Sequence, residues 1–371
     1  MSTGGWTEVE LVVESAYAGW RLDRYLVAKL GHLSRTRVQR ILATSLVSEL
    51  ALKSSTRVWP GLRFALRRAA VAEPPTPDTF GVLHLDDHLL VVDKPTGLPV
   101  HPSARYHHGT LVGLVRRRFG DGFAEPAHRL DRETSGVLAC ARGPVVARHL
   151  MHAFRRGEVV KDYLAVCEGW PSDEQFIVDA PIALGGAIVR IAVRIDREQG
   201  RPSRTRFVLL GRFEREGERF CVLHAMPETG RQHQIRVHLR EAGLPIVGDK
   251  IYGASEMLYD RFTRGLLDPQ DRARLRIERH ALHAARLRLR HPATDLMLDV
   301  GAPLSPDLRE FVGEALAYEV DGLVAGTAVS GAGQATRSHA PRAANTTPVS
   351  STSEVASTGG ATTAPMPLVP P

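Results

Sequence analysis

The sequence predicts an α+β protein built on a mixed, largely antiparallel central sheet with flanking helices. Two observations favour this class. Segments with alternating or continuous apolar residues outnumber segments with apolar residues at helical spacing, and the two kinds do not alternate strictly, as they would in a doubly wound fold. The chain has 371 residues, which is enough for two domains and for one sizeable core.

Residues 1–70 are expected to form a small α+β module with a core at about 20–68. Apolar residues at helical spacing predict a first helix over 22–30. Ser34 is a suitable N-cap for a second helix, and a turn and a strand are expected to follow over 55–68. Two short helices followed by β structure suit a module that binds the RNA backbone.

The second helix of this module carries three arginines: Arg35, Arg37 and Arg40. They cannot all lie on the apolar stripe of the helix, so at least two face outward. A basic exposed face suits contact with RNA phosphates, but it also suits a helix that is merely solvated. The pattern alone leaves these two interpretations open.

A second, larger domain is expected over 80–323, after a proline-rich linker over 71–79 that has no apolar periodicity. The strands expected in this domain span 80–85, 88–95, 159–169, 187–195, 203–213, 219–227 and 282–292. The expected helices span 110–119, 143–157 and 228–243. Over 324–371 the composition falls to mostly Ala, Gly, Ser, Thr and Pro, which predicts a disordered tail because little apolar surface can be buried.

The formal net charge of +7 favours a polyanionic partner such as nucleic acid, although many arginine-rich proteins carry this balance without one. The three cysteines are widely spaced and odd in number, so we expect reduced thiols in a cytoplasmic protein. We find no signal peptide and no apolar stretch of roughly 18 residues, so no membrane partner is expected. We expect the protein to be a monomer.

Metal and nucleotide sites receive no support from the sequence. His233 and His238 are five residues apart, on different faces of a helix, and they lack the acid of the H-E-x-x-H motif. His101, His107 and His108 lie close together but have no carboxylate or thiol cluster beside them. Neither G-x-G-x-x-G nor G-x-x-x-x-G-K-S/T occurs, so no cofactor and no metal is expected.

One group of residues differs from these patterns. Asp131 stands between two arginines and just before a Thr-Ser-Gly turn, while Lys161 and Tyr163 share an expected strand. Arg231 and Arg236 flank the sequence QHQI in the last expected helix. A carboxylate in a partly buried cleft stays ionised only beside a positive charge, and an arginine stays charged and grips both oxygens. These residues can therefore supply an acid, its partner and an aromatic ring for chemistry at a sugar or base carbon.

These residues lie in motifs that resemble the RluA-type RNA pseudouridine synthases. The motifs are HRLDRETSGVLACAR at 128–142, KDYLAVCEG at 161–169 and TGRQHQIRVHL…GLPIVGDKIYG at 229–253, in the order of that family. Weaker similarities lie at 86–102, 200–207 and 279–292, so the resemblance covers about 80–312. The N-terminal module is similar to the alpha-L RNA-binding module of the ribosomal-protein-S-four type, but SELALKSS stands where that module has an Asn-Gly turn.

The resemblance implies the pseudouridine synthase fold and an enzyme that isomerises uridine in RNA without cofactor or metal. The base is cut from the ribose at nitrogen 1, turned, and rejoined through carbon 5. By motif position Asp131 is the catalytic aspartate, which either attacks the sugar or removes a sugar proton. Arg236 is its favoured ion-pair partner, ahead of Arg231. Tyr163 would stack on the uracil and could take the proton from carbon 5.

The same resemblance implies RNA contacts around the aspartate. A uridine in folded RNA must leave its stack before a carboxylate can reach it, and Arg129 is at the position that fills the gap. Lys161 is expected to meet a phosphate. Ribosomal RNA is favoured over transfer RNA as the target.

Two other functions remain open from the sequence. A non-catalytic RNA-binding or ribosome-assembly factor on the same scaffold would be expected to lose one of Asp131, Tyr163 and Arg236. A glycosidase-like hydrolase would need a second carboxylate near Asp131, for which Glu133 is the nearest candidate. Assaying RNA for pseudouridine and for free uracil distinguishes the three functions.

Overall fold

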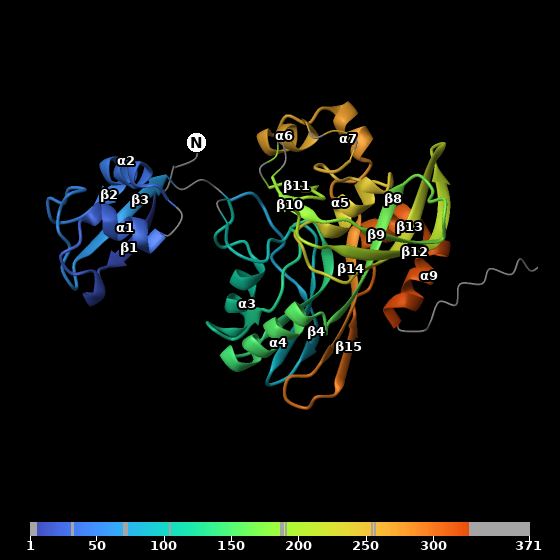
Figure 1. Ribbon diagram of the computed structural model, residues 1–371, viewed down its shortest axis with the longest axis horizontal. Coiled ribbons are helices and arrows are strands. Elements are labelled where there is room, and N and C mark those ends of the chain that lie inside the picture. The colour runs from blue at the N-terminus through green and yellow to red at the C-terminus, as the bar shows by residue number, and fades with distance from the viewer. Residues whose placement is uncertain are drawn as a thin grey trace, which may run out of the picture. The chain divides into compact units, whose positions relative to one another are not determined.

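The computed structural model describes residues 6–30, 33–69, 73–103, 105–185, 189, 191–253, 255 and 257–325. The described elements fall into an N-terminal group before residue 70 and a larger group after it (Figure 1). Of the linker expected over 71–79, residues 73–79 are described. Glu73 accepts hydrogen bonds from the backbone N–H groups of three consecutive residues: His107, His108 and Gly109.

The N-terminal group forms a small α+β unit. Its antiparallel sheet has the strand order β1-β3-β2, and apolar residues of α1 and α2 pack on it. β1 precedes the core expected from the sequence and pairs with β3 along its whole length. The bounds are β1 Trp6–Val12, α1 Leu22–Leu30, α2 Arg35–Ser45, β2 Leu46–Val47 and β3 Arg63–Ala69, with a 3-10 turn at Ser15–Tyr17.

Helix α2 begins at the N-cap predicted from the sequence, because the side chain of Ser34 accepts a hydrogen bond from the backbone N–H of Arg37. Arg35, Arg37 and Arg40 are all exposed. The guanidinium of Arg35 nevertheless donates to the buried carboxylate of Asp23, which links α2 to α1. Arg35 therefore has a structural partner, whereas Arg37 and Arg40 form no ion pair among the described residues.

The residues after 80 form a larger α+β unit around a ten-stranded sheet. The strands of this unit are β4 Gly81–Leu85, β5 Leu89–Lys94, β6 Glu125–Pro126, β7 Ser135–Ala141, β8 Val160–Glu168, β9 Gln175–Asp179, β10 Ile182–Leu184, β11 Val193–Ile195, β12 Arg204–Arg215, β13 Glu218–Pro227, β14 Leu282–Arg290 and β15 Met297–Gly301. The helices are α3 Leu111–Phe119, α4 Pro144–Arg156, α5 Gln234–Glu241, α6 Met257–Arg264, α7 Pro269–Leu275, α8 Pro306–Val312 and α9 Glu314–Ala325.

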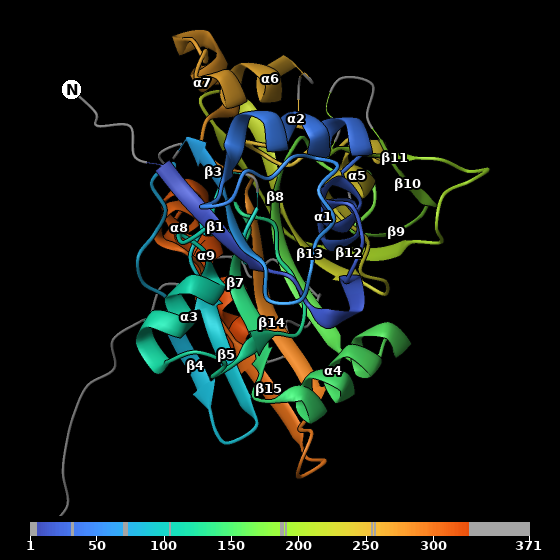
Figure 2. The same cartoon turned by 90° about the vertical axis from the view of Figure 1, so that its left-hand side faces the viewer.

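The large sheet has the strand order β4-β5-β7-β14-β8-β13-β12-β9, with β15 paired to β14 and β6 paired to β7 (Figures 1 and 2). Among the described residues, its strand pairs are antiparallel except for β7 and β14, which share a short parallel contact. β10 and β11 form a separate antiparallel pair. The predicted mixed, largely antiparallel sheet with flanking helices is therefore confirmed.

Strands β5 and β7 are buried on both faces, which explains their continuous apolar sequences. Leu90 and Val92 of β5 pack in one cluster with apolar residues of α3. Leu89 and Val91, which point to the other face, pack with apolar residues of α4. The two helices thus cover the two faces of this part of the sheet, and β7 packs against both clusters (Figure 2).

The other half of the sheet has its own core, formed by β8 and β13 with residues of α5, α8 and α9. All three cysteines are buried and free: Cys140 in β7, Cys167 in β8 and Cys221 in β13. Cys167 and Cys221 face each other in the register of β8 and β13. Their burial raises the pKa of the Cys140 and Cys167 thiols, which makes these side chains ordinary core groups.

Three expected segments differ from the structure. The helix expected over 228–243 is shortened to α5, because His233 before it adopts a left-handed conformation. Of the strand expected over 187–195, residues 193–195 form β11, residues 189, 191 and 192 lie outside a strand, and residues 187, 188 and 190 lie outside the described residues. α9 ends two residues inside the tail expected over 324–371, and residues 326–371 lie outside the described residues. Helices α6, α7, α8 and α9 and strands β9, β10 and β15 were not expected. None of the helices described here has the length and apolar character needed to cross a bilayer.

Candidate active site

Asp131 lies in the loop between β6 and β7, and the last residue of β5 and a residue just after it hold this loop. The Nζ atom of Lys94 donates to the carbonyl of Arg132 at 3.1 Å. The hydroxyl of Thr96 donates to the carbonyl of Glu133 at 2.9 Å. The sequence KPTG at the end of β5 therefore positions the backbone that carries the aspartate.

The loop enters β7 through a close approach that only glycine allows. Gly136 has a φ of +105°, and a Cβ atom there would lie 2.1 Å from the carbonyl oxygen of Ala284 in β14. Thr134, two residues earlier, is hydrogen-bonded through its hydroxyl to Nε2 of buried His280 at 2.8 Å. The Thr-Ser-Gly run thus lets β7 and β14 meet directly after Asp131.

Lys94 is a buried cation with no ion pair among the described residues. Its ammonium group donates to the carbonyls of Pro95, Leu98 and Arg132, at 2.8, 2.9 and 3.1 Å. Burial lowers its pKa to about 7. Three carbonyl dipoles therefore compensate this charge, and they belong to the segments that support Asp131.

Arg236 in α5 joins Asp131 to a second carboxylate. Its Nη1 donates to Oδ2 of Asp131 at 2.8 Å. Its Nε and Nη2 form a bidentate pair with Asp249, at 2.7 and 2.8 Å. The side chain of Asp249 is 0% exposed and that of Asp131 is 20% exposed, so Asp131 is the carboxylate that a ligand can reach.

Asp131 is held in its ionised form. Burial favours the neutral acid, but positive groups facing it, His233 when protonated and Arg236, lower the pKa of Asp131 to about 2. Because burial lowers the pKa of His233 itself to about 4, Arg236 is the cation that acts near neutral pH. Arg236 occupies Oδ2, and no hydrogen bond from a described residue reaches Oδ1. Oδ1 is therefore the oxygen that is open to a ligand in the cleft.

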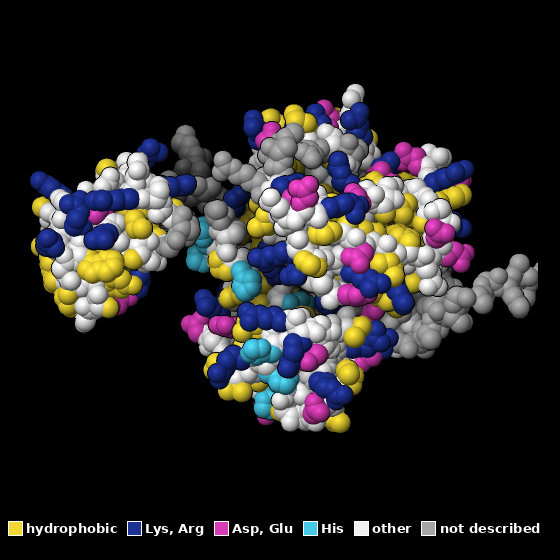
Figure 3. All heavy atoms as spheres, in the orientation of Figure 1, with side chains coloured by type: hydrophobic (Ala, Val, Ile, Leu, Met, Phe, Trp, Pro, Cys, Tyr) yellow, Lys and Arg dark blue, Asp and Glu magenta, His cyan; other side chains and the backbone are white. Residues whose placement is uncertain are grey.

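Asp131 lines a cleft of about 580 Å³ between its own loop, α4, β8 and the start of α5. Lys and Arg side chains gather around a hollow above α4 (Figure 3). The structure brings together in this cleft all the residues of the larger domain that the sequence singled out for catalysis or RNA contact: Arg129, Asp131, Lys161, Tyr163, Arg231 and Arg236.

Lys161 and Tyr163 are two residues apart in β8, so their side chains lie on the same face of the strand, as expected from a strand over 159–169. Burial and the nearby negative charge of Asp131 raise the pKa of Tyr163 well above its usual range, so its phenol keeps its proton at neutral pH. Burial lowers the pKa of Lys161, whose Nζ lies 3.4 Å from the carbonyl oxygen of Thr229. Tyr163 therefore offers the cleft a neutral aromatic ring.

Arginines without acidic partners lie at the rim of the cleft. Arg129 is exposed, and among the described residues the guanidinium of Arg231 donates only to the carbonyl of Pro202, at 3.4 Å. Arg155 of α4 also lines the cleft and was not singled out from the sequence. None of the three forms an ion pair with a described residue, so each can meet an external anion. Arg132 does not share this role, because it donates to Glu133 and to the hydroxyl of Tyr106.

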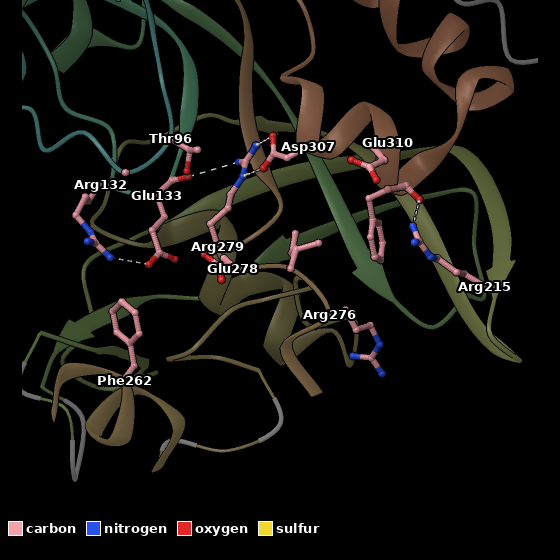
Figure 4. A pocket seen from close by; sticks show the side chains of 13 residues that line it. Thr96, Arg132, Glu133, Arg215, Phe262, Arg276, Glu278, Arg279, Asp307 and Glu310 are labelled. Carbon is pink, nitrogen blue, oxygen red and sulfur yellow. Dashed lines mark hydrogen bonds and ion pairs between the residues drawn. The ribbon is translucent and has the colours of Figure 1, made fainter. Parts of the chain in front are cut away.

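A second cavity of about 640 Å³ is lined by Glu133 and Arg132 but not by Asp131. Figure 4 shows its charged side chains facing one another, Arg132 with Glu133 and Arg279 with Asp307. Glu133 is also bonded to Lys250 at 3.0 Å. Glu133 is thus turned away from the cleft of Asp131 and is not the second carboxylate that a glycosidase-like hydrolase would need.

The described residues contain one cluster of metal-binding side chains, His84, Asp86 and His291. Both imidazole Nε2 atoms face Oδ2 of Asp86, at 2.6 and 3.0 Å. The Nδ1 atom of His291 accepts hydrogen bonds from the backbone N–H groups of Ala293 and Thr294. A neutral His291 therefore carries its proton on Nε2 and offers no lone pair there to a metal. We interpret the cluster as a hydrogen-bonded link between the β4–β5 and β14–β15 turns.

Comparison with known proteins agrees with this geometry. Residues 88–241 match the family described as RNA pseudouridylate synthase. The chain is 33% identical over 322 residues to ribosomal large subunit pseudouridine synthase C of Vibrio cholerae, an alignment that covers 82% of this chain and 96% of the relative. The chain belongs to the RluA-type RNA pseudouridine synthases. It is accordingly an enzyme that isomerises uridine in RNA to pseudouridine.

Further pseudouridine synthases are similar over comparable lengths. Ribosomal large subunit pseudouridine synthase D of Nitrosomonas europaea is 32% identical over 311 residues, which cover 81% of this chain and 86% of the relative. The solved structure of human RNA pseudouridylate synthase domain containing 1 is 27% identical, with a TM-score of 0.51, and covers 66% of this chain and 90% of that chain.

Four buried or nearly buried residues that support the cleft of this pseudouridine synthase were not assigned roles from the sequence: Lys94, His233, Asp249 and Tyr252. Each lies in a segment that carried the family resemblance, at 86–102 or 229–253. Their position in these motifs is the feature of the sequence that could have identified them. Their roles depend on distances between distant parts of the chain, which motif spacing does not reveal.

Proposed function

We propose that this pseudouridine synthase modifies uridine in RNA of the large ribosomal subunit, with Asp131 as its catalytic residue. The relatives that match most of the chain are named for the ribosomal large subunit, which supports this target. The observation that carries the role of Asp131 is its ionised carboxylate. Oδ2 is held by Arg236, while Oδ1 is free in a cleft that Tyr163 also lines.

The reaction requires a charged oxygen at this position. The N1–C1′ bond breaks and a C5–C1′ bond forms, and the proton lost from C5 balances the one gained at N1. Oδ1 of Asp131 either attacks the sugar or removes a sugar proton, and both routes need the ionised acid that Arg236 maintains. Tyr163 is protonated and is a poor proton acceptor, so we assign it to stacking on the uracil.

The rim arginines would bind the RNA around the target. Moving a uridine out of its stack costs a few kcal/mol, and the planar guanidinium of Arg129 is suited to fill the gap that it leaves. Lys161 and Arg231 would meet phosphates. Arg37 and Arg40 of the N-terminal unit are exposed without ion pairs, and we propose that they contact the RNA backbone.

Asp131→Asn tests this proposal, because it keeps the size of the side chain and its bond to Arg236 but removes the charge. We expect no detectable pseudouridine in a transcript of large-subunit ribosomal RNA, while RNA affinity changes by less than about twofold because phosphate contacts dominate it. Asp121→Asn is the matched control, since Asp121 is 94% exposed and lies outside the cleft. It should keep full activity.

The products separate this function from its alternatives. A fully active Asp131→Asn enzyme would refute the catalytic role of Asp131. Release of free uracil by the wild type would indicate a hydrolase. RNA binding by the wild type with neither product would indicate a non-catalytic assembly factor.

A further inference from the structure

His233 has a backbone conformation that residues with a side chain rarely adopt. Its φ and ψ are 52° and 20°, which place it in the left-handed region immediately before α5. Such a conformation in a residue other than glycine is held by its surroundings and is concentrated at functional sites. Here it brings the imidazole Nε2 to 3.7 Å from Oδ1 of Asp131, with the side chain 7% exposed.

The hydroxyl of Tyr252 determines how this imidazole is protonated. The hydroxyl accepts the backbone N–H of Val193 at 2.8 Å and lies 2.9 Å from Nδ1 of His233. Its own proton is therefore satisfied by donation to Nδ1, so a neutral His233 carries its proton on Nε2. The opposite tautomer would leave the buried phenol proton without an acceptor and would turn a lone pair of Nε2 toward a carboxylate.

Tyr252 also supports the other group that faces Asp131. The guanidinium carbon of Arg236 lies 5.1 Å from the centre of the Tyr252 ring. The ring thus packs against the residue that holds Oδ2, and the hydroxyl orients the residue that faces Oδ1. His233 is neutral near pH 7, because burial lowers its pKa to about 4, so it faces Oδ1 with an N–H dipole and no full charge.

We propose that Tyr252 and His233 are positioning residues that hold Oδ1 of Asp131 in its reactive orientation. The inference rests on the proposed function, in which Asp131 is catalytic. A separation of 3.7 Å is too long for a hydrogen bond, so the lone pairs of Oδ1 stay free for the substrate. The Nε2–H dipole still opposes rotation of the carboxylate away from the cleft, while Arg236 fixes the other oxygen.

His233→Gly removes the imidazole, and relief of the left-handed backbone offsets part of the stability lost with this buried side chain and its bond to Tyr252. We expect kcat to fall on the order of 100-fold, as for a displaced reactive group, with KM changed by less than about threefold. Glu216→Gly is the matched control, since Glu216 has a φ of 54° in the exposed β12–β13 turn. It should leave both kcat and KM unchanged.

Two further variants separate positioning from a merely structural role. Tyr252→Phe keeps the ring beside Arg236 but removes the hydroxyl, so kcat should fall about tenfold because the imidazole is no longer oriented. In the His233→Gly background the same change should lower kcat no further, because the hydroxyl acts through His233. His233→Gln restores an N–H near Oδ1, and its kcat should lie closer to the wild type than that of His233→Gly.

The outcomes are distinguishable from failure of the proposed function. An unchanged kcat in His233→Gly, or an equal effect of Tyr252→Phe in both backgrounds, overturns the positioning role. Should His233→Gly not fold, an unchanged kcat in Tyr252→Phe overturns it alone. An active Asp131→Asn enzyme in the same assay overturns the proposed function, whereas an inactive one beside a fully active His233→Gly overturns this inference only.

Discussion

Replacing Arg236 by alanine would leave two carboxylates without the cation that they share. Asp249 is inaccessible to solvent and Asp131 is mostly buried, so water cannot replace the guanidinium around Asp249 and only partly replaces it at Asp131. At neutral pH these three side chains together carry a net charge of −1, from two acids and one base. The substitution changes this charge to −2 within the same enclosed volume.

The expected loss of stability is large for a single substitution. Removing one partner of a buried ion pair costs about 3–5 kcal/mol, because the remaining charge is left uncompensated. We expect the free energy of unfolding of Arg236→Ala to fall by this amount at neutral pH.

The two carboxyl groups determine how the unfolding free energy should change with pH. In the wild type the pKa of Asp131 is lowered from 3.8 to about 2, so the stability it contributes is complete above 3.8 and is lost as the pH falls toward 2. In Arg236→Ala the guanidinium no longer opposes burial, which then raises the pKa of Asp131 above that of the unfolded chain. The folded variant then binds more protons than the unfolded one, so its stability rises as the pH falls from about 7.5 to about 5.

Urea unfolding followed by circular dichroism at both pH values measures the effect. The difference in unfolding free energy between the wild type and Arg236→Ala should become smaller toward about pH 5. Adding Asp249→Asn to the variant should recover part of the lost unfolding free energy. Arg240→Ala, an exposed position on the same helix, is the control and should cost less than about 1 kcal/mol. The reasoning is refuted if Arg236→Ala costs no more than Arg240→Ala, or if the difference does not narrow.

Three further predictions follow from other contacts. Lys94→Met removes an ammonium group whose pKa is lowered by burial from 10.5 to about 7. Because the unfolded chain binds this proton more tightly, the unfolding free energy of the wild type should rise relative to that of the variant between about pH 7 and pH 9. Urea titrations that show the same dependence of unfolding free energy on pH in both proteins would contradict this. Gly136→Ala would place a Cβ atom 2.1 Å from a carbonyl oxygen, so it should abolish activity and lower the Tm strongly. The control is Gly143→Ala: Gly143 has a φ of +90° but no atom lies within 4 Å of a Cβ there, so the unfolding free energy should fall by only about 1–2 kcal/mol. Arg155→Gln should reduce the slope of log RNA affinity against log salt by about 1, and an unchanged slope would exclude a phosphate contact.

The type of sheet could be predicted from the sequence because most of its strands have strong apolar patterns, although β9 and β15 were missed. β5 and β7 have continuous apolar runs, and the structure shows why, since helices cover both of their faces. Helices α6 and α7 are short, and part of their stability comes from tertiary contacts such as the bond from Arg261 to Asp271 at 2.5 Å. Helix α7 nevertheless begins with Asp268 as its N-cap, a proline, and a capping box with Asp271, a local signal that was present in the sequence and was not used.

The candidate site could be predicted only as a set of residue types. Asp131 and Arg236 are 105 positions apart, and the family resemblance rather than spacing paired them. Nothing in the sequence indicates that Arg236 serves a second carboxylate or that His233 takes a left-handed conformation. Both depend on how α5 packs against the segment that carries Asp249 and Tyr252, which is a property of the folded chain.

The second carboxylate orients the guanidinium that meets Asp131. A guanidinium facing a single carboxylate tends to bind both of its oxygens. Here Asp249 takes the Nε and Nη2 donors of Arg236 and accepts backbone N–H groups of Ile251 and Tyr252, so it does not move. Nη1 of the oriented guanidinium donates to Oδ2 of Asp131, and no bond from Arg236 reaches Oδ1. A carboxylate buried away from the cleft thus determines the orientation in which Arg236 meets Asp131, and in this orientation Oδ1 stays open to the cleft.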